Sequence, residues 1–295
     1  MPDIELRSVT KVYDDDQGVF DLSFSVEEGE AYAVLAPTGG GKSTAFSLLS
    51  GLLRPGEGDS LIRGMDCFKE REKIRFITSF VPSGVTFPSG QDGERYLHML
   101  MAWQGGVSSD RLRDLMEKLD INPMGRFGLM SAELRRKMTI LAGMMRDTPI
   151  LVLDEPYQGL GPHARNALSD LITEEKKKGK TILLLTHVLR EAQALCKRIA
   201  VVRQGRMVLE QKAEELSLLR QKVYHITFDS PETAGRFSQE WEKGVELIGS
   251  RAIVAVPGSP QTLIKTLANY SVLDLVGGRD QGEEAFLKYY GDDML

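Results

Sequence analysis

Alternating apolar and polar positions mark the first thirty residues of the chain. Residues 4–13 and 19–29 both alternate, which is the pattern of β-strands with one face buried and the other in water. The acidic stretch DDDQG separates them, so the pattern predicts two paired strands joined by a turn. The fully apolar run AYAVLA, residues 31–36, is typical of a short strand buried on both faces.

Buried strands then alternate with helical patterns along the chain. After residue 36, AFSLLSGLLRPGEG has helical spacing, and IRFITSFVP, residues 74–82, is interpreted as another strand. Further on, ILVLDEP, ARNALSDLITEEKKKGK and TILLLTH give the order strand, helix, strand, and IAVVRQGRMVLEQ predicts a closing hairpin. Because parallel strands need crossover helices, the order predicts an α/β domain with a parallel sheet at its core.

Two segments depart from this alternation. Residues 84–145 are rich in methionine and helical in period, which predicts a helical subdomain inserted in the sheet domain. Beyond residue 211 the order strand, helix, two strands, helix, strand predicts a small α+β accessory domain of ferredoxin-like type. We therefore expect one domain over residues 1–211 and a second over residues 212–295.

The composition narrows the functional class. With 295 residues, 42% of them hydrophobic, the chain is expected to build a packed globular core. A net charge of -5 argues against broad nucleic-acid binding. The lysine-rich run EEKKKGK is interpreted as a solvated helix end, and the two widely spaced cysteines as reduced thiols. An apolar run long enough to span a membrane is missing from the sequence, so any membrane role is expected to come through a partner.

The strongest chemical signal is APTGGGKST, a glycine-rich loop between a strand and a helix. Gly39, Gly40 and Gly41 allow backbone N–H groups to turn inward around phosphates, and Lys42 neutralises the β and γ phosphates. Ser43 offers a hydroxyl to Mg²⁺. The first position of the usual pattern is Ala36 instead of glycine, which is tolerated only where the backbone φ is negative.

A second signal is the end of ILVLDEP. Its apolar residues carry Asp154 and Glu155 to the carboxyl end of a predicted parallel strand, where α/β sheets bind their ligands. In that position Asp154 holds Mg²⁺ through water, and Glu155 orients and polarises an attacking water. His187 ends TILLLTH at the same sheet edge and is expected to reach the γ-phosphate; the alternative is a purely structural histidine.

Together these stretches resemble the ATP-binding subunit of an ABC transporter over residues 3–211. LAPTGGGKST is similar to the Walker A loop of that family, ILVLDEP to Walker B with its catalytic glutamate, and LLLTH to the switch histidine. The resemblance implies that Tyr13 stacks on adenine, unless it is only an edge-strand tyrosine. It also adds Thr44 and Ser131 to the expected nucleotide contacts, with ATP and Mg²⁺ as the implied ligands.

LMSAELRRK, residues 129–137, lies where this family carries the signature Leu-Ser-Gly-Gly-Gln. As an ordinary helix start, Ser131 would simply cap the helix. As a degraded signature, it retains the serine but has Ala132 and Glu133 in place of the glycines. The family points this helix at the ATP of a second subunit, where a glutamate would meet polyphosphate. Glu133 therefore either turns toward solvent or weakens that half of the site.

Other positions depart from the family in the same direction. Ser83 replaces the glutamine that the resemblance would place on Mg²⁺, and Gln158 and Gly161 replace a serine and an aspartate after Walker B. These changes indicate a subunit that keeps most of its own hydrolytic residues. The residues that would contact the nucleotide of the other subunit across the dimer interface are poorly suited to that role. The resemblance thus implies slow or asymmetric hydrolysis.

The resemblance also implies partners and a location. We expect a separate integral membrane permease and a second ABC ATPase subunit, as a homodimer or a heterodimer, with this chain cytoplasmic and peripheral on the inner face of the membrane. The ending VLDLVGGRDQGEEAFLKYYG resembles exporter ATPases that pair with a separate permease chain. Two alternatives stay open: a weakly hydrolysing regulatory subunit beside an active ATPase, and a soluble non-transport ABC ATPase. No nucleic-acid partner is expected.

Overall fold

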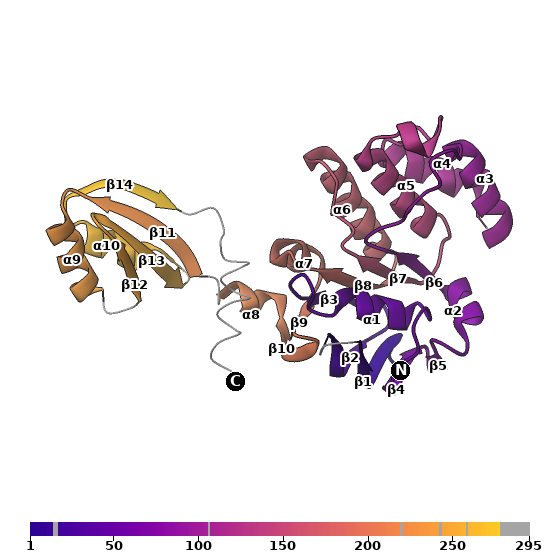
Figure 1. Ribbon diagram of the computed structural model, residues 1–295, viewed down its shortest axis with the longest axis horizontal. Coiled ribbons are helices and arrows are strands. Elements are labelled where there is room, and N and C mark those ends of the chain that lie inside the picture. Colours follow the sequence, from indigo (N-terminus) through magenta and orange to yellow (C-terminus); the bar gives the residue numbers. More distant parts are fainter. Residues whose placement is uncertain (14–16, 106, 219–220, 242–243, 258, 278–295) are drawn as a thin grey trace. The chain divides into compact units, whose positions relative to one another are not determined.

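The computed structural model describes residues 1–13, 17–105, 107–218, 221–241, 244–257 and 259–277 (Figure 1). The chain divides into two compact units, Met1–Gln211 and Lys212–Leu295. The first unit has two sheets and a helical part, and the second has one sheet with helices. Among these residues every helix is too short or too polar to cross a membrane.

An antiparallel sheet forms from the alternating N-terminal segments, as the sequence predicts. Its strand order is β2-β1-β4-β5, and each neighbouring pair is antiparallel. The inner face consists of apolar residues that are fully buried, such as Ile4, Leu6 and Leu22. The strands are β1 (Ile4–Val12), β2 (Gly18–Val26), β4 (Glu57–Ile62) and β5 (Met65–Asp66).

The second sheet has the order β10-β9-β3-β8-β7-β6, and β9, β3, β8, β7 and β6 run parallel. Its central strands β3, β7 and β8 are buried along their whole length, which explains their continuous apolar runs. The strands are β3 (Ala31–Leu35), β6 (Thr78–Val81), β7 (Ile150–Asp154), β8 (Thr181–Thr186), β9 (Arg198–Arg203) and β10 (Arg206–Lys212). The helices after β3, β7 and β8 are α1 (Lys42–Leu49), α6 (Pro162–Lys177) and α7 (Leu189–Leu195).

The strand predicted over residues 74–82 is wrong in its first half. Residues Arg71–Ile77 form helix α2, and β6 covers only Thr78–Val81. Within α2, Ile74 alone is buried, while Phe76 is 66% exposed. A two-turn helix can pack on the domain through a single buried apolar residue. A short apolar run in the sequence therefore does not distinguish such a helix from a strand.

A helical subdomain lies between β6 and β7 in the sequence, as predicted. Its elements are α3 (Gly93–Gln104), α4 (Ser109–Lys118), the 3₁₀ helix η2 (Phe127–Leu129) and α5 (Ala132–Met144). Phe87 and Phe127 stack with ring centroids 4.2 Å apart, and Tyr96 meets both edge-on. This aromatic group fixes the loop after β6 against α3 and the loop before α5.

The methionines of this subdomain have two different environments. Met138, Met144 and Met145 are fully buried and Met130 nearly so, which is core packing by adaptable side chains. Met99 and Met124 are 48% and 70% exposed. The methionine-rich composition therefore mainly reflects the core of the subdomain.

A buried carboxylate ties the helical subdomain to the sheet. Glu175 on α6 is completely buried and contacts Arg111, Lys178 and Lys180. Burial opposes its ionisation, but the hydrogen bonds from these three cations outweigh it and hold its pKa at about 2. The run EEKKKGK is thus only partly the solvated helix end that its composition indicates.

Both cysteines are free thiols, as expected, and both are buried. Burial raises the pKa of Cys67 and that of Cys196 to about 12. They are packing residues in this fold, since a nucleophilic cysteine needs a lowered pKa and access to solvent.

The second unit has the strand order β12-β13-β11-β14, with antiparallel neighbours. Helices α9 and α10 pack on one face through Phe237 and Leu263, against Ile226, Phe228 and Val254 (Figure 1). The elements are α8 (Ala213–Leu218), β11 (Gln221–Phe228), α9 (Pro231–Glu240), β12 (Val245–Ile248), β13 (Arg251–Pro257), α10 (Gln261–Leu267) and β14 (Val272–Gly277). The ferredoxin-like assignment stays a prediction. Most of the exporter-like ending lies outside the described residues, because these stop at 277.

We predict that Glu175→Gln lowers the free energy of unfolding by about 3 kcal/mol at pH 7, because three cations lose a buried partner. Its folded pKa lies below the ordinary 4.5, so the contribution is complete above that pH and disappears as the pH falls toward 2. Urea titrations at several pH values measure both effects. The control is Glu174→Gln on the same helix, whose side chain is 44% exposed and should cost less than about 1 kcal/mol. Equal losses from the two variants would contradict the assignment.

Candidate nucleotide site

The site lies where three parallel strands end. The backbone ladder continues one residue beyond the strands: the N–H of Ala36 donates to Thr186 O at 3.1 Å, and that of Glu155 to Leu185 O at 2.8 Å. These bonds set the loops after β3, β7 and β8 side by side. The chemistry-bearing residues of the three motifs therefore share one sheet edge, as the sequence predicts.

The glycine-rich loop turns sharply before α1. Gly41 has φ +103°, and a Cβ there would lie 2.8 Å from Val19 Cγ1, so only glycine fits. Ala36 is fully buried and is absent from the residues with positive φ, which explains why its methyl group is tolerated. The first turn of α1 carries no acidic side chain, so its N–H groups and dipole favour an anion.

Lys42 is buried at the start of α1. Its Nζ donates to Ala36 O at 2.6 Å and to Pro37 O at 2.9 Å, and it lies 3.2 Å from Glu155 Oε1. The side chains of Lys42 and Glu155 are only 8% and 11% exposed. The ammonium group therefore joins the glycine-rich loop to the end of β7 in a region of low dielectric constant.

Glu155 lies between two cationic or hydrogen-bonding partners. Besides Lys42, its carboxylate oxygens are each 2.9 Å from His187 Nδ1. Glu155 has φ +45°, a left-handed backbone that is costly for a residue with a Cβ. His187 is 47% exposed, so its ring links the buried carboxylate to the open side of the site.

Asp154 is buried beside Glu155, and its Oδ1 has no hydrogen-bond partner among the residues that the structure describes. Burial raises its pKa, and contacts with Ser83 offset this only in part. A buried carboxylate oxygen without a partner is costly unless a cation or an ordered water meets it. The geometry therefore fits the predicted metal contact of Asp154.

A cleft of about 300 Å³ opens over these residues, hereafter the loop cleft. Tyr13 borders it and is 44% exposed. Sequence analysis missed Gln17, Gly18 and Thr38. The full lining is Tyr13, Gln17, Gly18, Thr38, Gly39, Gly41, Lys42, Ser43, Thr44, Ser83, Glu155, Gln158 and His187.

Two expected residues support the loop cleft from behind, and one lies elsewhere. Gly40 is buried, with a hypothetical Cβ 3.0 Å from Ala36 Cβ, so it packs the loop. Asp154 is likewise buried behind the lining. Ser131 does not line the cleft of its own chain. Any contact of Ser131 with nucleotide would have to involve another subunit.

The stretch around Ser131 is a helix start, and its interpretation as an altered signature stays a prediction. Ser131 caps α5 by accepting a hydrogen bond from Leu134 N at 3.1 Å. Glu133 turns toward Gly161: a Cβ on that glycine would lie 3.1 Å from Glu133 Oε2. Lys137 Nζ is 3.9 Å from Glu133 Oε1. The carboxylate is thus partly neutralised within its own chain instead of extending freely into solvent.

Arg136 is the main residue that sequence analysis missed. Its buried guanidinium donates to backbone oxygens at the ends of β6 and β7. The available signal was its spacing, since Arg136, Ile140 and Met144 follow one another at four-residue steps on the buried face of α5.

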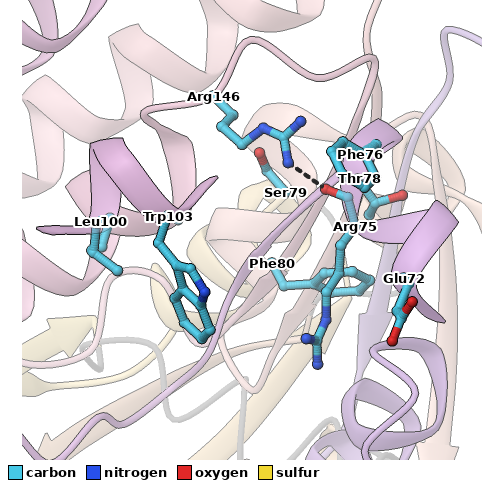
Figure 2. A pocket seen from close by; sticks show the side chains of 11 residues that line it. Glu72, Arg75, Phe76, Thr78, Ser79, Phe80, Leu100, Trp103 and Arg146 are labelled. Atoms are coloured by element: carbon cyan, nitrogen blue, oxygen red, sulfur yellow. Dashed lines mark hydrogen bonds between the residues drawn. The ribbon is translucent and has the colours of Figure 1, made fainter. Parts of the chain in front are cut away.

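An apolar groove of about 480 Å³ lies away from the loop cleft, between α2 and α3 (Figure 2). Leu100 and Trp103 of α3 form one side and Phe76 of α2 the other, with Phe80 of β6 between them. Arg146 lies 4.9 Å from the Phe76 ring centroid and donates to Arg75 O. Trp103 is 83% exposed, so the groove presents a large aromatic surface to solvent.

Comparisons with known proteins agree with this geometry. The ABC transporter family profile matches residues 19–158. The Nod factor export ATP-binding protein I of Burkholderia orbicola (strain AU 1054) is 32% identical over 213 residues, which are 70% of each chain. The protein of the same description from Rhizobium leguminosarum bv. viciae is 28% identical over 300 residues, covering 99% of this chain and 96% of the relative.

Solved structures show the same fold. A structure described as the ATP binding subunit of an ABC transporter is 25% identical with a TM-score of 0.65, and covers 72% of this chain and 91% of its own. A dimeric ATP-binding cassette bound to ADP and phosphate is 22% identical with a TM-score of 0.63, covering 71% and 98%. The fold class predicted for the first unit is confirmed.

The contact between Glu133 and Gly161 yields a double-mutant prediction. Gly161→Asp should destabilise the protein, because its carboxylate would compete with that of Glu133 for the same space. In the Glu133→Gly background the same change should be tolerated, with a coupling energy of about 1 kcal/mol or more by urea unfolding. Gly161→Asn is the control, because asparagine has nearly the shape of aspartate but no charge. Its coupling energy with Glu133→Gly should be smaller than that of Gly161→Asp. Additive effects of the two changes would exclude the contact.

Proposed function

Because the chain belongs to the ABC transporter family of ATP-binding subunits, we propose that it binds and hydrolyses ATP to drive export through a separate membrane permease. The observation that carries this is the Glu155 carboxylate, buried between Lys42 and His187 at the edge of the loop cleft. Of the function that the relatives' names state, we propose only export for this chain, because none of the described residues identifies a cargo.

The residues around the loop cleft suit a magnesium nucleotide. Ser43 and the unpartnered oxygen of Asp154 would hold the metal ion, whose chemistry is to neutralise phosphate charge. The N–H groups of the glycine-rich loop and the first turn of α1 would bind phosphate oxygens. Tyr13 would stack on the adenine ring from the rim of the cleft.

Glu155 is the proposed general base. It takes a proton from the water that attacks the γ-phosphorus as the bond to the leaving β-phosphate oxygen breaks, giving ADP and phosphate. His187 contacts the Glu155 carboxylate and orients it. Because His187 also lines the cleft, it could donate a hydrogen bond to the γ-phosphate. Lys42 must exchange its carbonyl and Glu155 contacts for phosphate oxygens, so nucleotide binding also releases Glu155 from its ion pair.

A second ATPase subunit is part of the proposal. In a head-to-tail dimer, Ser131 and the N-terminus of α5 would face the nucleotide of the other subunit. Glu133 would bring a carboxylate close to that polyphosphate, which is unfavourable at a dry interface. We expect slow turnover from this chain alone and faster turnover beside a subunit with an intact signature. The same observation favours the regulatory alternative, a weakly hydrolysing subunit that assists an active one.

The apolar groove is the proposed contact for the permease. Its exposed Trp103 and Phe76 offer an aromatic anchor site, and Arg75 and Arg146 add positive charge at the rim. A short amphipathic segment with an acidic end would complement both features. Membrane association on the cytoplasmic side would follow from this contact.

Glu155→Gln tests the proposed function. We expect the rate of ATP hydrolysis to fall by about 100-fold or more while ATP affinity changes little, because the amide fills the same space without accepting a proton. Phosphate release and equilibrium nucleotide binding measure the two quantities. Glu174→Gln, which changes a half-buried glutamate outside the site, is the control. An unchanged hydrolysis rate would refute the proposed role, and unchanged transport would favour the regulatory alternative.

A second prediction concerns the groove. Trp103→Ala should weaken association with the permease by about 10-fold, because a buried aromatic anchor contributes on the order of 1.4 kcal/mol or more. The isolated chain should keep its basal ATPase rate. Met99→Ala, an exposed residue of the same helix outside the groove lining, is the control. Co-purification yield and permease-stimulated ATPase are the measurements; equal behaviour of the two variants would exclude the groove.

A further inference from the structure

Arg136 makes an unusual set of contacts for a charged residue in a helix. Its side chain is buried, and the guanidinium donates to four backbone carbonyl oxygens. Nη1 lies 2.5 Å from Pro82 O and 3.1 Å from Ser83 O. Nη2 lies 3.3 Å from Asp154 O and 2.8 Å from Glu155 O. No carboxylate pairs with it directly among the described residues, and burial lowers its pKa.

The four oxygens come from two different functional loops. Pro82 and Ser83 follow β6, and Ser83 borders the loop cleft. Asp154 and Glu155 end β7 and carry the two carboxylates of the site. One planar cation therefore fixes the distance between these loops, since its donors diverge at set angles.

The contact with Glu155 has a specific consequence. Its left-handed backbone, φ +45°, persists only where neighbouring groups hold it. The peptide flanking it is held on one side by its N–H bond to Leu185 O and on the other by the bond from Arg136 to its own carbonyl. The N–H of Gln158 also donates to this carbonyl, at 3.1 Å, so without Arg136 only that turn bond restrains this side and the direction of the carboxylate toward the cleft is less tightly fixed.

Arg136 also lies on α5, which packs unusually close to β6. A Cβ on Gly143 would lie 2.6 Å from Val81 Cγ2 and 2.8 Å from Phe80 O, so helix and strand are in direct backbone contact. Gly143 and Phe80 line the apolar groove. The position of α5 relative to β6 therefore sets the place of both the groove wall and the Arg136 guanidinium.

We propose that Arg136 is a positioning residue for hydrolysis. It holds Glu155 and the Pro82–Ser83 loop at fixed positions relative to α5. A movement of the helical subdomain would therefore also move the general base. This rests on the proposed role of Glu155. Lysine cannot replace it fully, because an ammonium group is a compact donor that cannot reach both pairs of carbonyls.

The test compares Arg136→Gln and Arg136→Lys with Arg111→Gln in the full chain. Arg111 is a second largely buried arginine of the helical subdomain, with a side chain 11% exposed; it binds Glu175 and Met144 O and is distant in the sequence from both loops. We expect kcat to fall about 30-fold in Arg136→Gln and less in Arg136→Lys, with ATP affinity within about threefold of the unmodified chain. Arg111→Gln should lose stability but keep kcat.

Hydrogen exchange gives a readout that does not depend on hydrolysis. Arg136→Gln should increase amide exchange at residues 83–84 and 155–158 while leaving the glycine-rich loop unchanged, and Arg111→Gln should not reproduce this pattern. Unchanged exchange at both loops, or loss of ATP affinity in proportion to kcat, would overturn the positioning role. If the unmodified chain fails to hydrolyse ATP yet the exchange pattern appears, the proposed function fails while the positioning of Glu155 by Arg136 stands.

Discussion

Backbone pairing between β3, β8 and β7 is the interaction on which the site depends. The strands are parallel and in register, with Leu35 opposite Thr186 and Leu185 opposite Asp154. Each ladder continues by one further hydrogen bond: the N–H of Ala36 donates to Thr186 O, and the N–H of Glu155 donates to Leu185 O. Beyond these bonds the loops diverge. Lys42, Glu155 and His187 come from three distant parts of the sequence, and only this shared edge brings them within hydrogen-bonding distance.

Each polar group in this buried region loses its contact with water, and a nearby charge or hydrogen-bond partner must offset that cost. Lys42 and Glu155 neutralise one another, and the strained backbone of Glu155 is held by Leu185 and Arg136. Asp154 is different, because one of its oxygens has no hydrogen-bond partner in the described part of the chain. A site that is fully satisfied without ligand would gain little from binding it. The unpartnered oxygen is therefore consistent with a cation completing the site.

Sequence reasoning worked where a local pattern determines structure. Apolar runs located β3, β7 and β8, and glycine spacing identified the loop around Lys42, since both depend on neighbouring residues only. It failed at α2, where one buried isoleucine decides between helix and strand. It also missed Arg136 and misjudged Glu175, whose decisive partners lie more than fifty residues away in the sequence: Pro82 and Ser83 after β6 for Arg136, and Arg111 of α4 for Glu175. The four-residue spacing assigns Arg136 to the buried face of α5, but the sequence does not reveal which distant groups such a residue contacts.

The two altered motif positions, Glu133 and Gly161, are in contact within one chain, which changes how they are understood. Set beside the family motifs that the sequence resembles, position 133 has a carboxylate where the family has a glycine, and position 161 lacks the family's aspartate. In the fold the Glu133 carboxylate occupies the space beside Gly161 that a side chain there would fill. The pair thus keeps one carboxylate at this point of the subunit surface, supplied by α5 instead of by the loop before α6.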